Sequence, residues 1–240
     1  MSTIKSSDEH LTLNADGSGN DIKFQSNGTE VASISDAGKI TATNFAANAD
    51  DLEIQSSTGE KMIKCVKDAQ VNLYYDNSKK LATSSTGITV TGGIALGGTA
   101  TANILDDYEE GSFTPVFTGS SGSTGSYDTG EHEARYTKIG RLVTIQFKVT
   151  LTNKGSWGGE VRFTTLPFSV SVTMPSTGSV GLTQVDIPGD ASAHNVYVTS
   201  GVTYWRIFYS TDQGALSLLQ VSEVANNSAI TGTFTYTTND

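Results

Sequence analysis

The residues best suited to chemistry lie in the stretch DDYEEGSFTPVF, residues 106–117, where carboxylates crowd around one tyrosine. The acids are Asp106, Asp107, Glu109 and Glu110, and Tyr108 lies between them. Clustered carboxylates act as acid–base pairs in hydrolases, as ligands of hard cations, or as a hydrated junction between domains. Because residue types alone do not separate these roles, the surrounding elements must decide.

The motifs of nucleophilic and metal-dependent catalysis are missing from the sequence. Asp190 and His194 suggest an esterase pair, but no Gly-x-Ser-x-Gly motif supplies the nucleophile. The histidines are scattered, and neither H-x-x-x-H nor C-x-x-C occurs. The segment from Asp16 to Asp21 has oxygen-bearing side chains at alternate positions, as in a calcium loop, but Asn27 occupies the twelfth position, so a turn is favoured. We expect no enzyme, no cofactor and no metal site, although a glycosidase would need only two carboxylates.

Aromatic residues in loops are the alternative source of a binding site. Trp157 is flanked by glycines and is hard to bury within its own turn, and an exposed ring could stack on a sugar. Trp205 lies in a predicted strand and is expected in the core or in a subunit interface. We take loops 119–132, 153–159, 189–195 and 211–214 as the variable surface. The candidate receptor-binding residues on them are Trp157, Tyr127, Asp128, His194 and Asp212.

Composition excludes several classes of protein. The net charge of −10 argues against nucleic-acid binding, which needs clustered Lys and Arg. With Cys65 as the single cysteine, no disulfide forms within the chain. No apolar run is long enough for a bilayer and no signal-peptide pattern opens the chain, so membrane insertion is not expected. All the arginines and most aromatic residues follow residue 105, which indicates two regions.

The first region contains a loose strand–turn repeat. Units begin near residues 22, 52 and 73, and each has a short apolar alternation followed by a polar turn. Asn27-Gly28 is a strong hairpin signal, because both residues tolerate positive φ. Each unit carries too few apolar residues to be stable alone. The sequence favours a fibrous shaft of three intertwined chains, each burying its apolar stripe against the other two, over a monomeric β-solenoid or sandwich.

The second region predicts an antiparallel β domain. Val143, Ile145, Phe147, Val149 and Leu151 share one face of a long strand. Further strands are predicted over 160–168, 201–210, 214–222 and 229–238, with turn clusters at 174–179 and 188–195. Short strands separated by such turns favour a jelly-roll-like antiparallel β-sandwich.

Four motifs in this order carry a family resemblance. They are LDDYEEGSFTPVF, RYTKIGRLVTIQF, GGEVRFTTLPF and a tail ending GTFTYTT. Together they resemble the C-terminal domain of tailed-bacteriophage fibre and structural proteins, and LYYDNSKKLATSSTGITVTG resembles the shaft repeats of marine and cyanophage fibres. The resemblance covers most of the chain. Phe113 stands where the family often has Trp, and Phe234 and Tyr236 lie in a slightly altered last strand, without a change in hydrophobic role.

The resemblance implies a homotrimer located in a virion. We expect residues 1–20 to anchor the chain to other virion proteins, 21–105 to form the shaft and 106–240 the head domain. The expected function is a tail fibre or spike that binds a host surface receptor, a glycan above all, during adsorption. The alternative is a head fibre, collar or capsid decoration protein with a structural role. The stretch 106–110 with Phe113 then becomes the trimer and domain junction, at which Gly111 lets the chain change direction.

Overall fold

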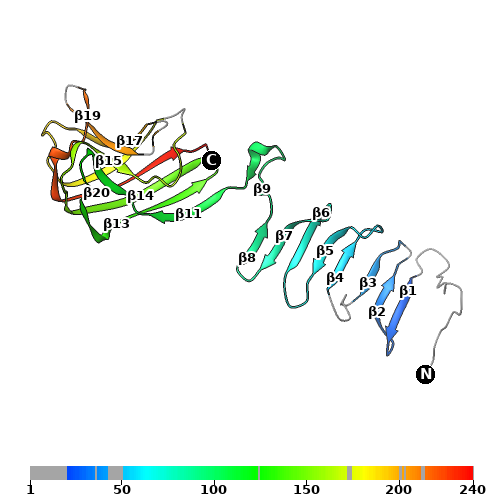
Figure 1. Ribbon diagram of the computed structural model, residues 1–240. Coiled ribbons are helices and arrows are strands. Elements are labelled where there is room, and N and C mark those ends of the chain that lie inside the picture. Colours follow the sequence, from blue (N-terminus) through cyan, green and yellow to red (C-terminus); the bar gives the residue numbers. More distant parts are fainter. Residues whose placement is uncertain are drawn as a thin grey trace. The chain divides into compact units, whose positions relative to one another are not determined.

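The computed structural model describes residues 21–35, 37–42, 51–123, 125–171, 175–199, 202, 204–211 and 214–239. The chain divides into two compact units, one ending at Thr91 and one beginning at Gly92. Within the described residues, the units contain antiparallel strands and two short 3-10 turns, η1 (Thr101–Asn103) and η2 (Val221–Glu223) (Figure 1). The predicted all-β class and its antiparallel pairing are therefore confirmed.

The first unit consists of small sheets built from hairpins. A three-stranded sheet contains β1 (Ile22–Ser26), β2 (Thr29–Ile34) and β3 (Ile40–Ala42). A five-stranded sheet contains β4 (Leu52–Gln55), β5 (Lys61–Cys65), β6 (Val71–Tyr75), β7 (Ser78–Ser84) and β8 (Gly87–Val90), paired in chain order.

The hairpins of this unit repeat the same local geometry. Asn27-Gly28 joins β1 to β2, and Asp76-Asn77 joins β6 to β7, with positive φ at all four residues. This is the backbone of the two-residue turns that match the twist of a hairpin. The pairing register shifts after Phe24, Ile54 and Leu73, one position in each of three hairpins. The strand–turn repeat seen in the sequence is thus a structural repeat.

One face of the five-stranded sheet is apolar from edge to edge. A row of directly opposed residues crosses all its strands: Ile54, Ile63, Leu73, Leu81 and Val90. A neighbouring row on the same face contains Leu52, Cys65, Val71, Thr83 and Ile88. In the single chain Leu52, Ile63, Cys65 and Leu81 are half-buried, whereas Ile54 is exposed by 50%, Leu73 by 40% and Ile88 by 66%. The β1–β3 sheet repeats the pattern, with Ile22, Ile34 and Ile40 in one row.

The opposite face of the five-stranded sheet is polar and ion-paired. Lys64 on β5 contacts Asp51 at 2.7 Å and Glu53 at 3.0 Å, and Lys61 contacts Glu53 at 3.2 Å. Hydrogen bonds from Lys64 hold the pKa of both carboxyl groups below their usual range. A hydrated, charged face opposite an uncovered apolar face makes each sheet amphipathic.

The second unit is dominated by one ten-stranded antiparallel sheet. Its strands are β11 (Tyr108–Phe113), β12 (Val116–Ser121), β13 (Ser126–Ile139), β14 (Leu142–Asn153), β15 (Gly158–Thr164), β16 (Ser176–Val185), β17 (Ala193–Val198), β18 (Trp205–Ser210), β19 (Leu216–Leu218) and β20 (Val224–Thr237). The strand order is β11-β13-β14-β20-β16-β17-β18-β15-β12, and β19 pairs with β18. A short hairpin of β9 (Ile94–Ala95) and β10 (Ile104–Leu105) precedes it.

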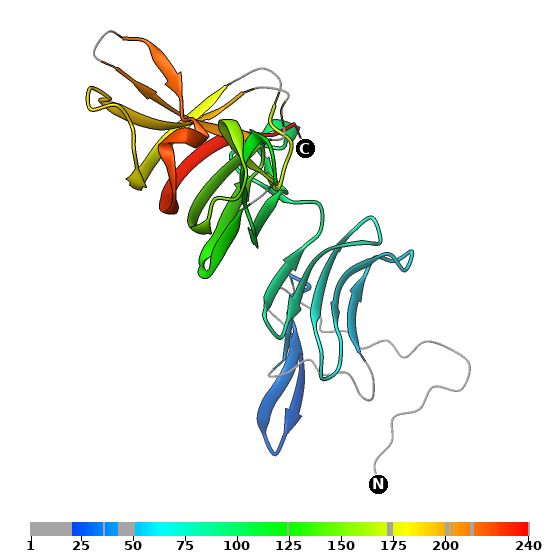
Figure 2. The ribbon, with the colours of Figure 1, turned by 60° about the vertical axis from the view of Figure 1, so that its left-hand side comes forward.

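The sheet curls around an aromatic core. Phe147 on β14 lies 5.7 Å from the Phe163 ring on β15 and 4.5 Å from the Trp205 ring on β18. Strands β20, β16 and β17 lie between β14 and β18 in the sheet order, so these contacts cross the interior of the curl. The curl of the sheet, coloured from green to red, is seen in Figure 2. Phe234 on β20 adds a ring 4.9 Å from Trp205. The predicted core position of Trp205 is confirmed, since the residue is fully buried.

The strands form one continuous sheet, whereas a sandwich has two separate ones. The bridge is made by β16 and β17, neither of which the sequence predicts as a strand, and the predicted turns 174–179 and 188–195 cover the first residues of each. That local prediction is wrong, because β16 hides its alternation behind small residues. The inward-facing Gly178 of β16 packs against Phe234. A Cβ added to Gly178 would lie 2.3 Å from the Phe234 Cβ. Val180 and Leu182 continue the same face of the strand.

The two edge strands are brought together by side chains. Strands β11 and β12 lie at opposite ends of the sheet, yet only residues 114 and 115 separate them in the chain. The Tyr127 hydroxyl on β13 donates to the Phe117 carbonyl on β12 at 2.5 Å. The His132 ring, stacked on Tyr127 at 3.9 Å, contacts the Pro115 carbonyl through Nε2. Side-chain bonds from β13 to the backbone of Pro115 and Phe117 thus link the two ends of the curled sheet, and we call this place the seam.

Candidate functional site

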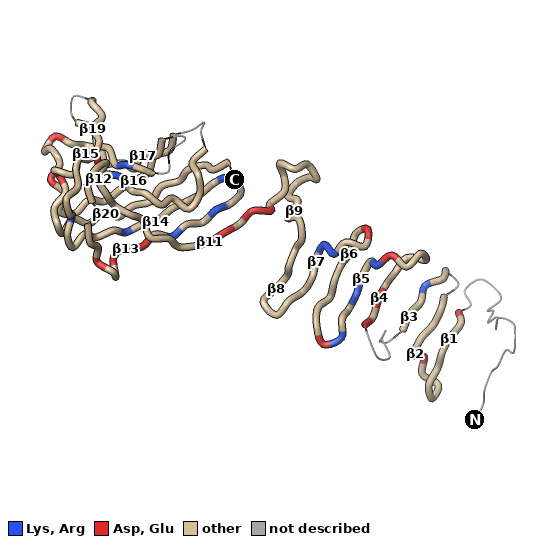
Figure 3. The backbone as a smooth tube through the Cα atoms, in the orientation of Figure 1, with Lys and Arg blue, Asp and Glu red and all other residues tan. Residues whose placement is uncertain are grey.

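The acidic stretch 106–110 leads into β11, which is an edge strand of the curled sheet. Figure 3 shows acidic residues gathered just ahead of β11 and along it. The Tyr108 hydroxyl donates to Glu110, and the Tyr136 hydroxyl on β13 donates to Glu109. These hydrogen bonds raise the pKa of both tyrosines. Glu109 and Glu110 thus lie on β11, which pairs with β13, and Asp106 is an exposed residue ahead of this strand.

The prediction that the chain changes direction at Gly111 is wrong. Gly111 lies within β11 in extended backbone, directly opposite Tyr136. A Cβ at this position would lie 2.6 Å from the Tyr136 ring, so the ring occupies the space over the glycine. Phe113 follows on the same face, with its ring 6.5 Å from that of Tyr136. A larger residue at this position would displace the Tyr136 ring.

Asp107 neutralises a lysine that is buried under the sheet. The Lys138 side chain is only 6% exposed, and its ammonium forms an ion pair with the Asp107 carboxylate. The same ammonium lies 5.0 Å from the centre of the Phe168 ring. A buried ammonium with a single carboxylate partner is a structural element, because removing the partner leaves an uncompensated charge.

We expect Asp107→Asn to lower the free energy of unfolding of the second unit by about 1–3 kcal/mol, because Lys138 loses its counter-charge. The loss is smaller than for a fully buried pair, because Asp107 is itself partly hydrated. Adding Lys138→Met should recover most of the loss. Urea unfolding followed by circular dichroism measures both. The matched control is Glu131→Gln, which removes the solvent-exposed pair with Lys148 and should cost well under about 1 kcal/mol. Equal losses in Asp107→Asn and the control would contradict the structural role.

The structure places the predicted receptor-binding residues in different settings. Trp157 is buried, with its ring 4.9 Å from that of Phe117, so its predicted exposure is wrong. Tyr127 is half-buried at the seam. Asp128 is exposed and accepts a hydrogen bond from the Gly130 amide at 2.9 Å. His194 is half-buried on β17 opposite Tyr209. Asp212 and residues 16–20 of the calcium-like loop lie outside the described residues.

Trp157 is buried because its turn folds back onto β12. Glycines in β12 and just after it bring the two backbones together. A Cβ on Gly119 would lie 2.9 Å from the Trp157 Cβ, and one on Gly122 would lie 2.1 Å from the Ser156 carbonyl. The glycines thus let the β12 backbone approach closely enough for the indole to reach the core.

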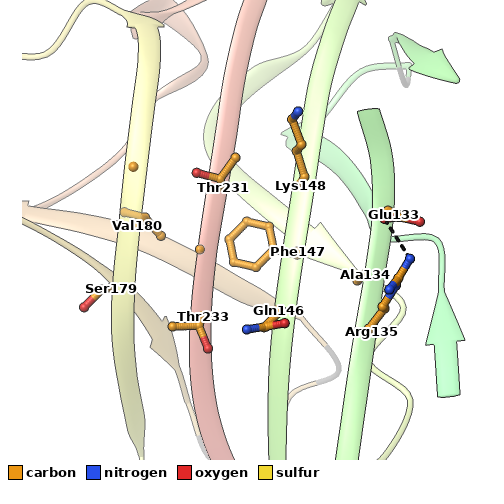
Figure 4. A pocket seen from close by; sticks show the side chains of 12 residues that line it. Glu133, Ala134, Arg135, Gln146, Phe147, Lys148, Ser179, Val180, Thr231 and Thr233 are labelled. Carbon is orange, nitrogen blue, oxygen red and sulfur yellow. Dashed lines mark hydrogen bonds and ion pairs between the residues drawn. The ribbon is translucent and has the colours of Figure 1, made fainter. Parts of the chain in front are cut away.

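A polar hollow of about 690 Å³ lies on the outer face of the sheet, over β13, β14, β20 and β16. One row of opposed residues crosses it: Arg135, Gln146, Thr233 and Ser179. Figure 4 shows Gln146 and Lys148 on β14 between Arg135 on β13 and the threonines of β20. A second hollow of about 710 Å³ shares Arg135 and Gln146 and extends to Ser112 on β11. We call the two hollows together the polar strip.

The polar strip offers many hydrogen-bond donors and acceptors. Hydroxyls come from Thr231 and Thr233, and Gln146 adds an amide. The Arg135 guanidinium is 3.4 Å from Glu133. Open surfaces of this kind suit hydroxyl-rich ligands, which need several weak polar contacts in place of an apolar cavity.

The strip could not be found in the sequence, because its members occupy one outward position on each of several strands. Outward threonines on β20 and serine on β16 carry no motif of their own. Only the strand register brings them together. Among the described residues, no group of three or more His, Cys, Asp or Glu is placed to hold a metal ion. No described helix is long and apolar enough to cross a membrane.

Comparisons with protein-family models, curated proteins and solved structures found no match.

Proposed function

We propose that the chain is a homotrimeric fibre protein of a tailed-phage virion, in which the first unit forms an intertwined shaft and the second unit binds a host surface glycan during adsorption. The proposal joins the resemblance of the motifs to the amphipathic sheets of the first unit. The curled sheet of the second unit takes the place of the jelly-roll-like head domain. Residues 1–20 would attach the fibre to other virion proteins.

The observation that carries the proposal is the uncovered apolar row from Ile54 to Val90. Such a row, continuous over five strands, is unfavourable in water unless another surface covers it. Copies of the same chain provide an identical apolar row, and three chains around one axis bury all three rows together. The charged face with Lys64 remains outside in water.

The polar strip supports the receptor-binding part of the proposal. It is open, rich in hydroxyl groups and formed on a rigid sheet, which are properties of sites for neutral or charged saccharides. A second function, structural fibre or decoration without a specific receptor, is supported by the burial of Trp157. That residue was the candidate for sugar stacking, and it has no exposed ring face.

The two functions are separated by competition for host cells. If the protein binds a receptor, purified trimer added before the phage should reduce adsorption, and antibodies to the second unit should do the same. If it is a structural decoration, adsorption should not change, and electron microscopy of labelled particles should place the chain on the capsid or collar. The trimer itself is checked by light scattering, which should give about three times the 25.2 kDa of one chain.

A further inference from the structure

Two arginines oppose one another on the outer face of the curled sheet, away from the polar strip residues already described. Arg162 on β15 and Arg206 on β18 are direct partners in the strand register. Their neighbours Val161, Phe163, Trp205 and Ile207 are fully or almost fully buried, so the guanidinium groups point away from the core. Like charges directly opposite in a sheet destabilise it. An anion between the two guanidinium groups would relieve this repulsion.

Only one carboxylate supplies that anion within the described residues. Glu160 accepts from Arg162 Nε at 2.8 Å and lies 3.4 Å from Arg206 Nη1. Arg206 Nη2 donates to the Thr199 hydroxyl at 2.9 Å. The Arg206 and Glu160 side chains are 18% and 17% exposed, so the group is substantially desolvated. Two guanidinium groups and one carboxylate leave one positive charge uncompensated, in a chain whose net charge is −10.

Aromatic rings fix both guanidinium groups before any ligand arrives. The Tyr204 ring lies 4.4 Å from Arg162 Cζ and 5.7 Å from Arg206 Cζ. The Tyr197 ring lies 5.8 Å from Arg206 Cζ. Among the hydrogen bonds between described residues, Arg162 Nη1 and Arg206 Nε have no acceptor. Planar donors held by stacking suit the recognition of carboxylate, sulfate or phosphate oxygens.

We propose that Arg162 and Arg206, framed by Tyr204 and Tyr197, form a binding site for the anionic group of an acidic saccharide. This inference rests on the proposed function, because it assigns a charged glycan to the second unit. The anion binds Arg162 Nη1 and Arg206 Nε, which have no acceptor among the described residues, and supplies the second negative charge that Glu160 alone does not provide. The tyrosine rings offer faces to the sugar C–H groups beside that anion.

Calorimetry on the full-length trimer tests the site with glucuronate, inorganic sulfate and glucose at constant ionic strength. We expect binding of glucuronate and sulfate and no binding of glucose. Glucuronate binding tighter than sulfate binding identifies a carboxylate sugar as the ligand, and the reverse order identifies a sulfated or phosphorylated sugar. Absence of binding by both anions would overturn the proposal.

Variants with opposite expected signs test the assignment to these residues. Arg162→Gln with Arg206→Gln should weaken anion binding at least about tenfold, since charge-assisted hydrogen bonds are lost. Glu160→Gln should strengthen it by about tenfold, because the competing carboxylate is gone. The matched control, Arg141→Gln, removes an exposed arginine from the turn between β13 and β14, outside the polar strip and the arginine pair, and should leave binding unchanged. If the double variant does not fold, Glu160→Gln decides alone, and unchanged or weaker binding in it overturns the proposal.

Host-cell competition separates this inference from the proposed function. If wild-type trimer and the double arginine variant both reduce phage adsorption equally, the protein binds its receptor elsewhere and the arginine site is wrong. If neither reduces adsorption while calorimetry shows arginine-dependent anion binding, the site stands and the proposed receptor function fails. If only the wild type competes, both are supported.

Discussion

Replacing Leu73 by glutamate should convert the trimer into monomers. Leu73 lies at the centre of the apolar row, opposed by Ile63 on β5 and Leu81 on β7. In the proposed trimer, three glutamates would face one another in an apolar interior, where burying an unpaired carboxylate costs several kcal/mol. Light scattering at micromolar concentration should report the mass of one chain, and the thermal transition of the shaft should be lost.

The matched control for this variant is Thr89→Glu. Thr89 is exposed on the polar face of the same sheet, opposite Ala82. The same change in charge at this position should leave the trimer intact. A wild-type chain that is already monomeric at micromolar concentration, or a trimer that survives Leu73→Glu, would contradict the shaft. Cys65 gives a second readout, because it lies on the apolar face, and mild oxidation of the trimer should cross-link chains in pairs and leave a third unpaired.

Replacing Trp205 by alanine should produce the largest loss of stability in the second unit. Its ring stacks on Phe163 at 3.9 Å and lies 4.5 Å from Phe147, so the change removes contacts from both sides of the curled sheet. Truncating a fully buried aromatic residue costs about 3–5 kcal/mol. We expect the melting temperature of the second unit to fall by roughly 10 °C. Guanidinium unfolding followed by the fluorescence of the remaining tryptophan, Trp157, measures the loss of free energy, and a thermal melt measures the fall in melting temperature.

The control is Leu216→Ala on β19, where the side chain is 71% exposed. This substitution removes apolar atoms without opening a cavity and should change the free energy of unfolding by less than about 0.5 kcal/mol. A similar loss for Trp205→Ala and Leu216→Ala would mean that the aromatic cluster does not form the core.

Local alternation made parts of the fold predictable from sequence. The inward face of β14, from Val143 to Leu151, was predicted correctly, because its alternation is complete within one strand. The turn at Asn27-Gly28 was also predicted, since these residues alone favour positive φ. Both signals are contained in short stretches of chain. They need no knowledge of the partner strand.

The remaining features depend on residues that are distant in sequence. The inward Gly178 becomes informative only once Phe234 is known to lie beside it. The two arginines of the proposed anion site are separated by two intervening strands in the sequence and meet only through the pairing of β15 with β18. Burial of Trp157 likewise depends on close backbone approach to β12. No local pattern encodes these pairings.

The position of β20 determines when the second unit can fold during synthesis. This strand follows all the others of its sheet in sequence, yet it lies between β14 and β16, with Leu142 opposite Thr237. Until the ribosome has passed residue 237, β14 and β16 each present an unpaired edge, and nascent chains on one polysome can join through these edges. Folding of this unit therefore cannot be completed before residue 237 has been synthesised, and slow or truncated synthesis should favour aggregation over assembly.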